Sequence, residues 1–511
     1  MYKNSRQRKQ AERDKKLADE ILTGKVKVYY EPPKKKSQAN RIGGATGEEG
    51  AKEVLAEQYM RLLGLLIPGI LAMFSTVEDL RALHKTKHKL PALILYGIIM
   101  FMSQTSSRRE ANREIGGSEV AELIQRLVPE FTSMPHADTL ARLLEVIDPG
   151  TMEKQYEELV REFVKSDFFK AVNPGQIIVL ADGTMKFVRD YCWDERALSR
   201  NAGNPEKETY YAYMMESVLI LNNGMVLPLL TETMENGERL DGDKAKQDCE
   251  TKAFKRLAAR LVKLLGKGRV TMVLDGLYAT GPMMSTCTNY GWEFMITLKR
   301  GCLNTVWEDY EGLQKIEKEN TLEARWGERY QLYHWSNDIE YIYGNNNKKL
   351  ILNVVTCRES CYGINPKKSG KPSEKHTDFA WLSSSRVNAE NVFRLCTEIA
   401  RRRWYIENHF LTLKHQGYSY SHCFSLNWNA MKGFHCLAKF ANFINAFITC
   451  SQNMGDYIIA EGIKGVVKKA WTYIKEHGLP DGACSIAPVC IDDNGRRPKI
   501  RFRQIKLKHT A

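Results

Sequence analysis

The 12 cysteines of this 511-residue sequence include no Cys-x2-Cys pair, and the closest two are Cys357 and Cys361. Closely spaced cysteine pairs are the usual sign of a structural zinc site, so we expect no such site here. Cysteines scattered through a long chain are typical of a cytoplasmic protein, in which the thiols stay reduced. The cysteine pattern therefore predicts a cytoplasmic protein with mostly buried, free thiols.

Long apolar segments are also lacking. The longest uninterrupted apolar run is LPALILYGIIMFM at residues 90–102, which is shorter than the roughly 20 residues that a membrane-spanning helix needs. The first residues, MYKNSRQRKQAERDKK, contain no apolar core, so we expect no secretory signal. A phosphate loop of the form GxxxxGK[ST] is absent as well. We expect no membrane association and no nucleotide site of the P-loop type.

Positive charge is what the sequence has in excess, with a net charge of +14. Such a balance favours an anionic partner, nucleic acid first, although a soluble basic protein without such a partner has the same composition. Much of the excess lies near the two ends. Residues 1–51 are predicted to form a basic, partly disordered arm, and residues 451–511 a helix followed by a basic tail.

Between these ends the sequence changes character several times. Helical periodicity predicts an all-helical domain at residues 52–172, a candidate DNA-binding domain. Residues 173–299 contain three strands, a helix, a strand, a helix and a strand, which predicts the first part of an RNase H-like α/β core. Residues 300–385 are predicted to be a β-rich insertion. Helical periodicity returns at residues 386–450, the expected second part of the core.

Two of the predicted strands end in an aspartate. Asp182 follows an apolar run in QIIVLADGT, and Asp275 follows another in RVTMVLDGLYAT. Side chains at the carboxyl ends of strands in an α/β sheet point into the crevice where ligands bind. Two carboxylates there fit a hard divalent cation such as Mg²⁺, whereas each Asp-Gly alone also fits a simple turn.

A third acid, Glu407, lies in the basic and aromatic stretch RRRWYIENHFLTLK. On a continuous α-helix Arg403, Glu407 and Lys414 share one face, because they are four and seven residues apart. Glu407 could then complete a two-metal site while Arg403 and Lys414 hold phosphates. A surface helix with an ordinary Arg–Glu pair has the same spacing.

These motifs resemble those of DDE transposases of bacterial insertion sequences. RW-x-IE-x-x-F and the spacing Arg403-x3-Glu407-x6-Lys414 are similar to the Tyr-x2-Arg-x3-Glu-x6-Lys signature of the insertion sequence four family, with Ala400 at the tyrosine position. The contexts ADGT and LDGLYA are similar to the first and second aspartates of that family. The resemblance spans roughly residues 174–450 and includes the β-rich insertion.

The resemblance implies a function. Asp182, Asp275 and Glu407 are expected to be catalytic and to bind two Mg²⁺ or Mn²⁺ ions, with Arg403 and Lys414 contacting DNA. The implied reaction is cleavage at the ends of a mobile element, followed by attack of the freed 3′-hydroxyl on target DNA. The implied partner is double-stranded DNA, both terminal inverted repeats and target, bound by a dimer or larger assembly in a prokaryotic cytoplasm. Two alternatives are an RNase H-like endonuclease without strand transfer and a domesticated, non-catalytic DNA-binding protein.

Overall fold

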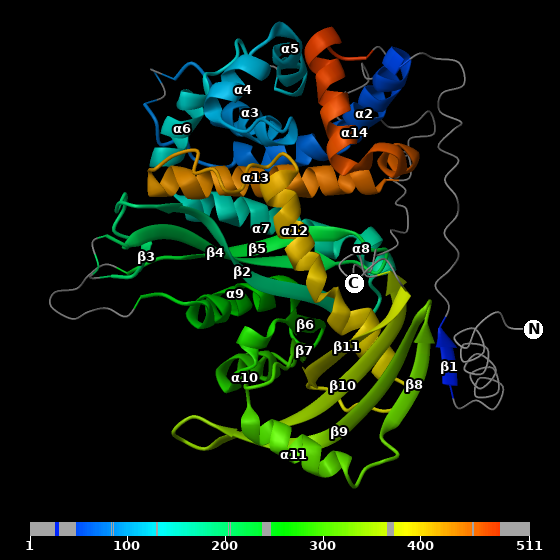
Figure 1. The fold of residues 1–511 in the computed structure, drawn as a ribbon. Coiled ribbons are helices and arrows are strands. Elements are labelled where there is room, and N and C mark those ends of the chain that lie inside the picture. The colour runs from blue at the N-terminus through cyan, green and yellow to red at the C-terminus, as the bar shows by residue number, and fades with distance from the viewer. Residues whose placement is uncertain are drawn as a thin grey trace, which may run out of the picture. The chain divides into compact units, whose positions relative to one another are not determined.

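The computed structural model describes residues 26–29 and 48–480, except 83, 85, 129–130, 203, 205, 238–246, 365–371 and 452–453. Most of the predicted basic arm and all of the basic tail lie outside these described residues. The fold is mixed α/β, with a large sheet and many helices (Figure 1). The described chain divides into two compact units, the first formed by residues 26–29, 178–180 and 267–404, and the second by the rest.

The first unit is dominated by strands. Its elements are β1 (Val26–Tyr29), β6 (Val270–Leu274), the 3₁₀ turn η3 (Gly276–Tyr278), α10 (Gly281–Asn289), β7 (Glu293–Thr297), α11 (Asn304–Gln314), β8 (Thr321–Trp326), β9 (Arg329–Tyr343), β10 (Lys348–Ile364), β11 (Pro372–Ser383), the π-helical turn η4 (Arg394–Ile399) and the 3₁₀ turn η5 (Ala400–Arg403). The strand order is β1-β8-β9-β10-β11-β7-β6, followed by β2. Strands β6 and β7 are parallel, and β8 to β11 are antiparallel.

Strand β9 corrects one prediction. RYQLYHWS and IEYIYGN are predicted as separate strands with a polar turn between them, but the structure has one strand over both. Ile339 pairs with Leu352 and Ser336 with Val354, so β9 has one extra residue at this point. Asp338 takes a positive φ of 59° there. The polar residues therefore form a β-bulge, which bends a strand without ending it.

The second unit contains most of the helices. Its elements are α2 (Glu48–Ser75), α3 (Leu90–Met102), α4 (Arg108–Glu114), α5 (Ser118–Leu127), α6 (Ala137–Val146), α7 (Pro149–Lys165), α8 (Asp167–Val172), β2 (Ile177–Arg189), β3 (Leu198–Arg200), β4 (Thr209–Ile220), β5 (Val226–Met234), α9 (Glu250–Leu265), α12 (Trp404–His415), α13 (Trp428–Cys450) and α14 (Gly455–His477). Strand β2 is shared between the units, and in this one the order is β2-β4-β3 with β5 paired to β4. The apolar runs YYAYMMESVLILNN and MVLPLLTET, joined by an Asn-Asn-Gly turn at 222–224, predict an antiparallel hairpin. This prediction is confirmed, since Ile220 pairs with Val226 around Gly224, whose φ is 86°.

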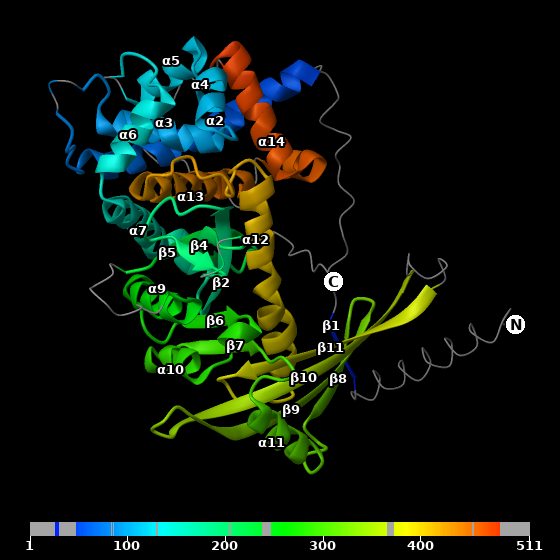
Figure 2. The same cartoon turned by 60° about the vertical axis from the view of Figure 1, so that its left-hand side comes forward.

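Helix α13 forms the centre of this unit. It lies between the helices α3 and α6 on one side and the helix α7 and the strand β5 on the other, as both ribbon views show (Figures 1 and 2). The contacts are close at two glycines: a Cβ on Gly97 of α3 would lie 2.6 Å from a methyl group of Leu437, and one on Gly433 would lie 2.8 Å from Leu144. Helices from the early part of the chain and α13 therefore share one core.

Helix α2 is the one described helix that is long and apolar enough, over Lys52–Ser75, to cross a membrane by length and composition. Its side chains pack inside the unit, where buried Tyr59 contacts Trp471 and buried Phe74 contacts Phe440. Residues 76–82, for which the sequence predicts a helix, form none. There the Arg81 guanidinium bonds Asp79 and the carbonyl of His88, so side chains replace the helical backbone hydrogen bonds.

Candidate active site

Asp182 lies in the middle of β2, which corrects the expectation that an Asp-Gly turn ends this strand. The strand continues to Arg189. Gly183 is not among the described residues with a positive φ, the conformation that a tight Asp-Gly hairpin turn requires. A Cβ on Gly183 would lie 2.6 Å from atoms of both Tyr213 and Glu250. A glycine is needed at this position because the side chains of Tyr213 and Glu250, joined by a hydrogen bond of 2.7 Å, occupy the space that a Cβ would fill.

Thr184, two residues after Asp182, contacts the predicted signature segment. Its buried hydroxyl oxygen accepts a hydrogen bond of 2.8 Å from the Lys414 ammonium, which comes from α12. Burial lowers the pKa of Lys414 below its ordinary value. The structure therefore fixes the last residue of the predicted Arg-x3-Glu-x6-Lys pattern to the strand that carries the first predicted aspartate.

Asp275 follows β6 directly, as predicted, and precedes the short turn η3. The Lys299 ammonium donates to its Oδ2 at 2.7 Å. Burial acts to raise the Asp275 pKa, but the hydrogen bonds from Lys299 and from the Gly276 N–H, together with the charge of Arg403, lower it overall. The carboxylate is therefore ionised at neutral pH.

Lys299 is a site residue that the motif analysis missed. It lies two residues after β7, the parallel neighbour of β6. A Cβ on Gly276 would lie 2.9 Å from the aliphatic part of the lysine, so this glycine gives Lys299 room to reach Asp275. The cation two residues beyond an apolar strand was a signal that could have identified it.

Arg403 reaches the same aspartate. Its NH1 lies 3.8 Å from Asp275 Oδ1, its side chain is mostly buried, and its guanidinium lies over the ring of Trp404 at 4.7 Å. The predicted single helix is not continuous here: a π-helical turn and a 3₁₀ turn precede α12, and Arg403 ends the 3₁₀ turn. Regular α-helix therefore begins only at Trp404, directly after Arg403, and the shared helix face of Arg403, Glu407 and Lys414 stays a prediction.

Arg401, in the same basic triplet, is buried and packed against other side chains of the first unit. It forms an ion pair with Glu359 in which both side chains are almost fully buried. Its guanidinium also lies over the rings of Phe379 (4.6 Å) and Trp326 (5.2 Å). Ala400, where the insertion sequence four signature has tyrosine, is buried as well. A tyrosine side chain would have to displace its neighbours at this position.

Glu407 lies in the first turn of α12 and is partly exposed. Among the described residues, no three Asp, Glu, His or Cys side chains gather closely enough to hold a metal ion. Asp275 belongs to the first unit, and Asp182 and Glu407 belong to the second. The metal site formed by these three acids therefore stays a prediction.

A buried charge network, also missed by the sequence analysis, holds the segment that follows α12. Glu216 of β4 accepts hydrogen bonds from the Tyr420 hydroxyl (2.9 Å) and the Thr231 hydroxyl (2.6 Å), and lies 3.1 Å from the ring of His435. Lys186 of β2 donates to the Tyr420 carbonyl at 3.0 Å. Tyr420 is thus bonded to two strands, which fixes the exit of α12.

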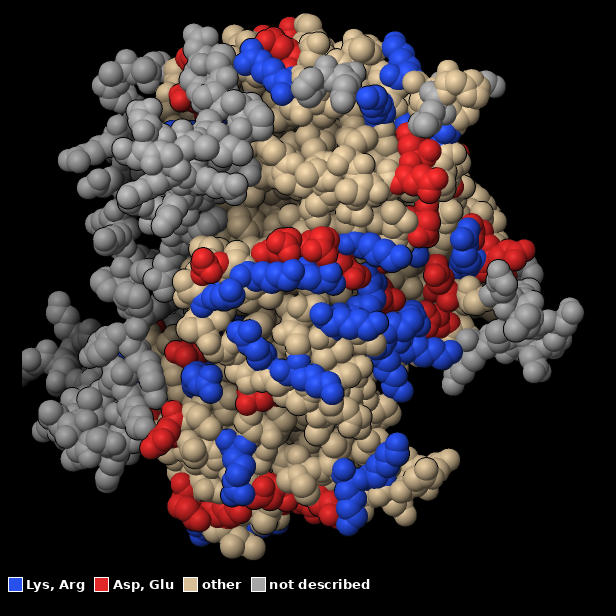
Figure 3. All heavy atoms as spheres, turned by 180° about the vertical axis from the view of Figure 1, so that it is seen from behind, with Lys and Arg blue, Asp and Glu red and all other residues tan. Residues whose placement is uncertain are grey.

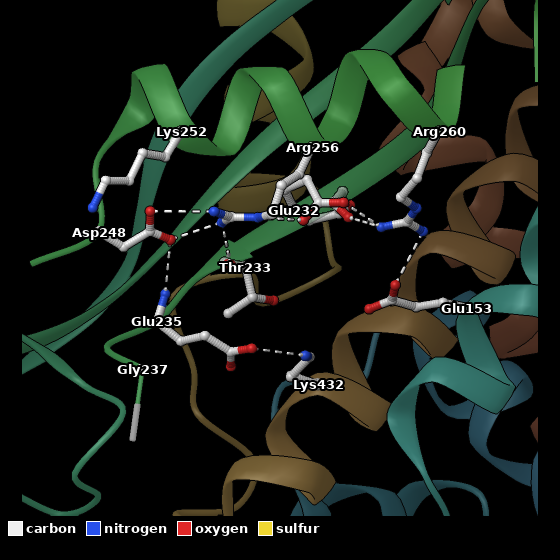
Figure 4. A pocket seen from close by; sticks show the side chains of 11 residues that line it. Glu153, Glu232, Thr233, Glu235, Gly237, Asp248, Lys252, Arg256, Arg260 and Lys432 are labelled. Carbon is white, nitrogen blue, oxygen red and sulfur yellow. Dashed lines mark hydrogen bonds and ion pairs between the residues drawn. The ribbon is translucent and has the colours of Figure 1, made fainter. Parts of the chain in front are cut away.

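A charged cleft of about 430 Å³ lies on the second unit beside α9 (Figure 4). Its arginines are neutralised within the protein: Arg256 pairs with Asp248 (2.7 Å), and Arg260 pairs with Glu232 (2.7 Å) and Glu153 (3.0 Å). The cleft has as many acids as cations among its lining side chains, so it lacks the excess charge that would select an anion or a metal ion.

Residues 71–160, from the end of α2 into α7, match the family model described as DDE_Tnp_1-associated. This match points to a DDE transposase family and to a transposase-related function. No curated protein matches the chain significantly.

Proposed function

We propose that this protein is a transposase of the insertion sequence four type, which cuts DNA at the ends of a mobile element and joins the freed ends to target DNA. One observation carries the proposal. Each predicted aspartate motif contacts one end of the predicted signature segment: Asp275 forms an ion pair with Arg403, and Thr184 of the ADGT motif accepts a hydrogen bond from Lys414. The second pair is 230 residues apart in sequence. Such contacts, one within each unit, are expected if the signature segment belongs to the same catalytic machinery as the two aspartate motifs.

The strand pairing supports an RNase H-like core. In the first unit the order is β7-β6-β2, with β6 and β7 parallel, and in the second β2 is followed by β4, with β5 antiparallel to β4. The helices α9 and α10 connect β5, β6 and β7 in sequence. This order resembles that of RNase H-like sheets, and strands β8 to β11 correspond to the predicted insertion.

The side chains fit a divalent cation. Asp182, Asp275 and Glu407 offer only carboxylate oxygens, the ligands that Mg²⁺ and Mn²⁺ prefer, and Asp275 is ionised at neutral pH. Two bound ions would activate the attacking oxygen and stabilise the leaving one. Arg403 and Lys414 would bind phosphate oxygens beside these acids. In this arrangement the two cationic side chains would offset the negative charge of the DNA phosphates, and the three carboxylates would bind the metal ions.

Two phosphoryl transfers make up the proposed reaction. In the first, water attacks the phosphorus at the element end, the P–O3′ bond breaks, and a 3′-hydroxyl is released. In the second, that hydroxyl attacks a target phosphodiester, forming a new P–O bond and releasing a target 3′-hydroxyl. The side chains of Arg403 and Lys414 are proposed to hold the phosphate in line with the attacking oxygen.

We assign terminal-repeat recognition to the helical region that contains residues 71–160, together with the basic segments outside the described residues. Phosphate contacts would give affinity that falls with salt, and base contacts would select the element ends. We propose assembly as a dimer or larger complex on paired ends, in the cytoplasm of a prokaryote and associated with the nucleoid.

The test uses linear DNA that contains the gene with its native flanks, incubated with the full chain and Mg²⁺. We expect nicks or breaks at inverted repeats, and transfer of a labelled end into a plasmid. Asp182→Asn, Asp275→Asn and Glu407→Gln should each abolish cleavage but retain DNA binding, whereas Asp378→Asn, which alters an exposed acid paired with Arg358, should cut normally.

Normal cleavage by the Asp275→Asn variant would refute the site. Cleavage without end transfer would instead indicate the endonuclease alternative, and binding without cleavage by the unaltered chain would indicate the non-catalytic alternative.

A further inference from the structure

The ion pair between Lys299 and Asp275 involves a carboxylate that the proposed reaction needs for a metal ion. The Lys299 ammonium donates to Asp275 Oδ2 at 2.7 Å, and the Arg403 guanidinium lies 3.8 Å from Oδ1. Both oxygens of the carboxylate therefore face protein cations. A divalent cation on Oδ2 would be repelled by the ammonium on the same oxygen. The lysine and a metal ion would thus compete for Asp275.

Exposed ion pairs are common on this protein, and most such pairs contribute little to stability. On the face drawn in Figure 3, many of the blue Lys and Arg side chains border red Asp and Glu side chains. In the ordinary pair Lys349–Glu340 of the first unit, both side chains are well exposed, at 60% and 46%. In the Lys299–Asp275 pair the lysine is 55% exposed but the aspartate only 22%. The carboxylate is therefore held within the fold, and the ammonium is the partner that can leave.

The main chain of Lys299 is anchored, which leaves movement to its side chain. Its carbonyl accepts hydrogen bonds from the Trp307 indole and from the Cys302 N–H, each 3.2 Å long. The aliphatic part of the side chain crosses Gly276, where a Cβ would lie 2.9 Å from it. The ammonium is therefore carried on a flexible stem from a fixed base beside Asp275.

We infer that Lys299 is a positioning residue that couples DNA binding to metal binding at Asp275. In the absence of DNA its ammonium occupies Oδ2 and weakens metal binding there. A DNA phosphate beside Asp275 offers the ammonium a second anion, because a lysine binds phosphate as a mobile point charge. The carboxylate oxygen then becomes available to the metal ion, so each ligand strengthens the binding of the other. The inference rests on the proposed function for the metal ion and the DNA.

The first experiment measures Mn²⁺ binding to the full chain without DNA, from the electron paramagnetic resonance signal of the free ion. Asp275→Asn defines the binding that depends on this carboxylate. We expect Lys299→Gln to bind Mn²⁺ about two- to fivefold more tightly than the unaltered chain, since an exposed ion pair shifts an equilibrium by up to about that factor. Lys299→Arg, which keeps the positive charge, should bind like the unaltered chain. Lys349→Gln, which breaks the ordinary pair with Glu340, should leave the Kd unchanged.

The second experiment measures Kd for the gene's flanking DNA by fluorescence anisotropy, with and without Ca²⁺, which also binds carboxylate oxygens. In the unaltered chain and in Lys349→Gln, Ca²⁺ should strengthen DNA binding, because the coupling between two ligands is reciprocal. In Lys299→Gln this strengthening should be about two- to fivefold smaller, because the metal ion no longer displaces an ammonium. Circular dichroism establishes that the variants fold like the unaltered chain. Equal Mn²⁺ affinity of Lys299→Gln and the unaltered chain would overturn the inference, and so would an equal effect of Ca²⁺ on both.

Cleavage assays on the same proteins separate this inference from the proposed function. If the unaltered chain cuts DNA but Lys299→Gln binds Mn²⁺ no more tightly, the inference is wrong and the function stands. If the unaltered chain does not cut DNA but Lys299→Gln binds Mn²⁺ more tightly through Asp275, the function is wrong and the role of Lys299 at Asp275 stands.

Discussion

Arg401 and Arg403 belong to the same Arg triplet, and the structure predicts opposite consequences for their loss. In Arg401→Met the aliphatic part of the side chain is kept, but the charge facing buried Glu359 is removed. Glu359 retains the Arg329 guanidinium (2.9 Å) and the Gln331 amide (2.8 Å), so the loss should lie at the low end of the 3–5 kcal/mol typical of broken buried pairs. Adding the lost contacts of the guanidinium with two aromatic rings, we expect a destabilisation of about 4 kcal/mol.

The pH dependence of this effect has a definite sign. Burial acts to raise the Glu359 pKa, but the hydrogen bond and charge of Arg401, with Gln331 and Arg329, lower it overall. A carboxyl whose folded pKa is lowered contributes stability above its unfolded pKa and loses that contribution as pH falls through its folded pKa. The stability difference between the unaltered chain and Arg401→Met should therefore be full at pH 7 and shrink below about pH 4.

Urea unfolding followed by tryptophan fluorescence measures the effect, and Trp326, which lies beside Arg401, reports locally. Arg403→Met is the matched comparison. Its ion pair with Asp275 is longer, at 3.8 Å, so we expect less than about 1 kcal/mol of lost stability but a loss of DNA cleavage. Equal stability of Arg401→Met and the unaltered chain would refute the reasoning, as would equal destabilisation by the two substitutions.

Three further predictions concern the second unit. Glu216→Gln should lower the thermal unfolding midpoint by several degrees, because it removes a buried charge that three neighbours bind. Gly183→Ala should cost about 1–3 kcal/mol in urea unfolding, since its Cβ would lie 2.6 Å from Tyr213 and Glu250. Burial lowers the Lys186 pKa to about 8 in the folded protein. Between pH 8 and 10.5 the unfolded chain therefore binds more protons at this lysine than the folded chain does, so the free energy of unfolding should rise with pH in this range. The variant Lys186→Met should show a smaller rise.

Each of these predictions has a contradicting outcome. An unchanged midpoint for Glu216→Gln would mean that the network adds no stability. Gly183→Ala should be relieved by the additional change Tyr213→Ala, which removes one clashing ring, and failure of that rescue would contradict the packing argument. Parallel pH profiles for Lys186→Met and the unaltered chain between pH 8 and 10.5 would show that this lysine is not buried as described.

Local signals in the sequence predicted several elements correctly. The turn after Asn223 requires a positive φ, and Gly224 supplies it, so the hairpin of β4 and β5 follows from neighbouring residues alone. Helix α9 likewise ends at Gly266, which has a φ of 87°. Asp275 ends its strand because the chain turns immediately into η3. In these cases the residues that determine the conformation are adjacent to it.

Predictions failed where distant residues determine the conformation. Gly183 suggests a turn by itself, but it is accommodated in a strand by Tyr213 and Glu250. The long strand β9 depends on a bulge opposite β10, and no local pattern distinguishes that bulge from a turn. The contact of Lys299 with Asp275 requires two parallel strands to lie side by side. Helix α11 and strand β8 of the insertion were not predicted, because the periodicity of each is brief.

The position of α13 has a consequence for synthesis of the protein on the ribosome. Helices α3, α6 and α7 emerge early, but the surface against which they pack is residues Trp428–Cys450. Until that segment is translated, the almost entirely apolar helix α3 has no partner for its Leu437-facing side. The region that matches transposase-associated domains must therefore wait for nearly the whole chain, and premature termination should yield an aggregation-prone fragment that lacks a folded amino-terminal region.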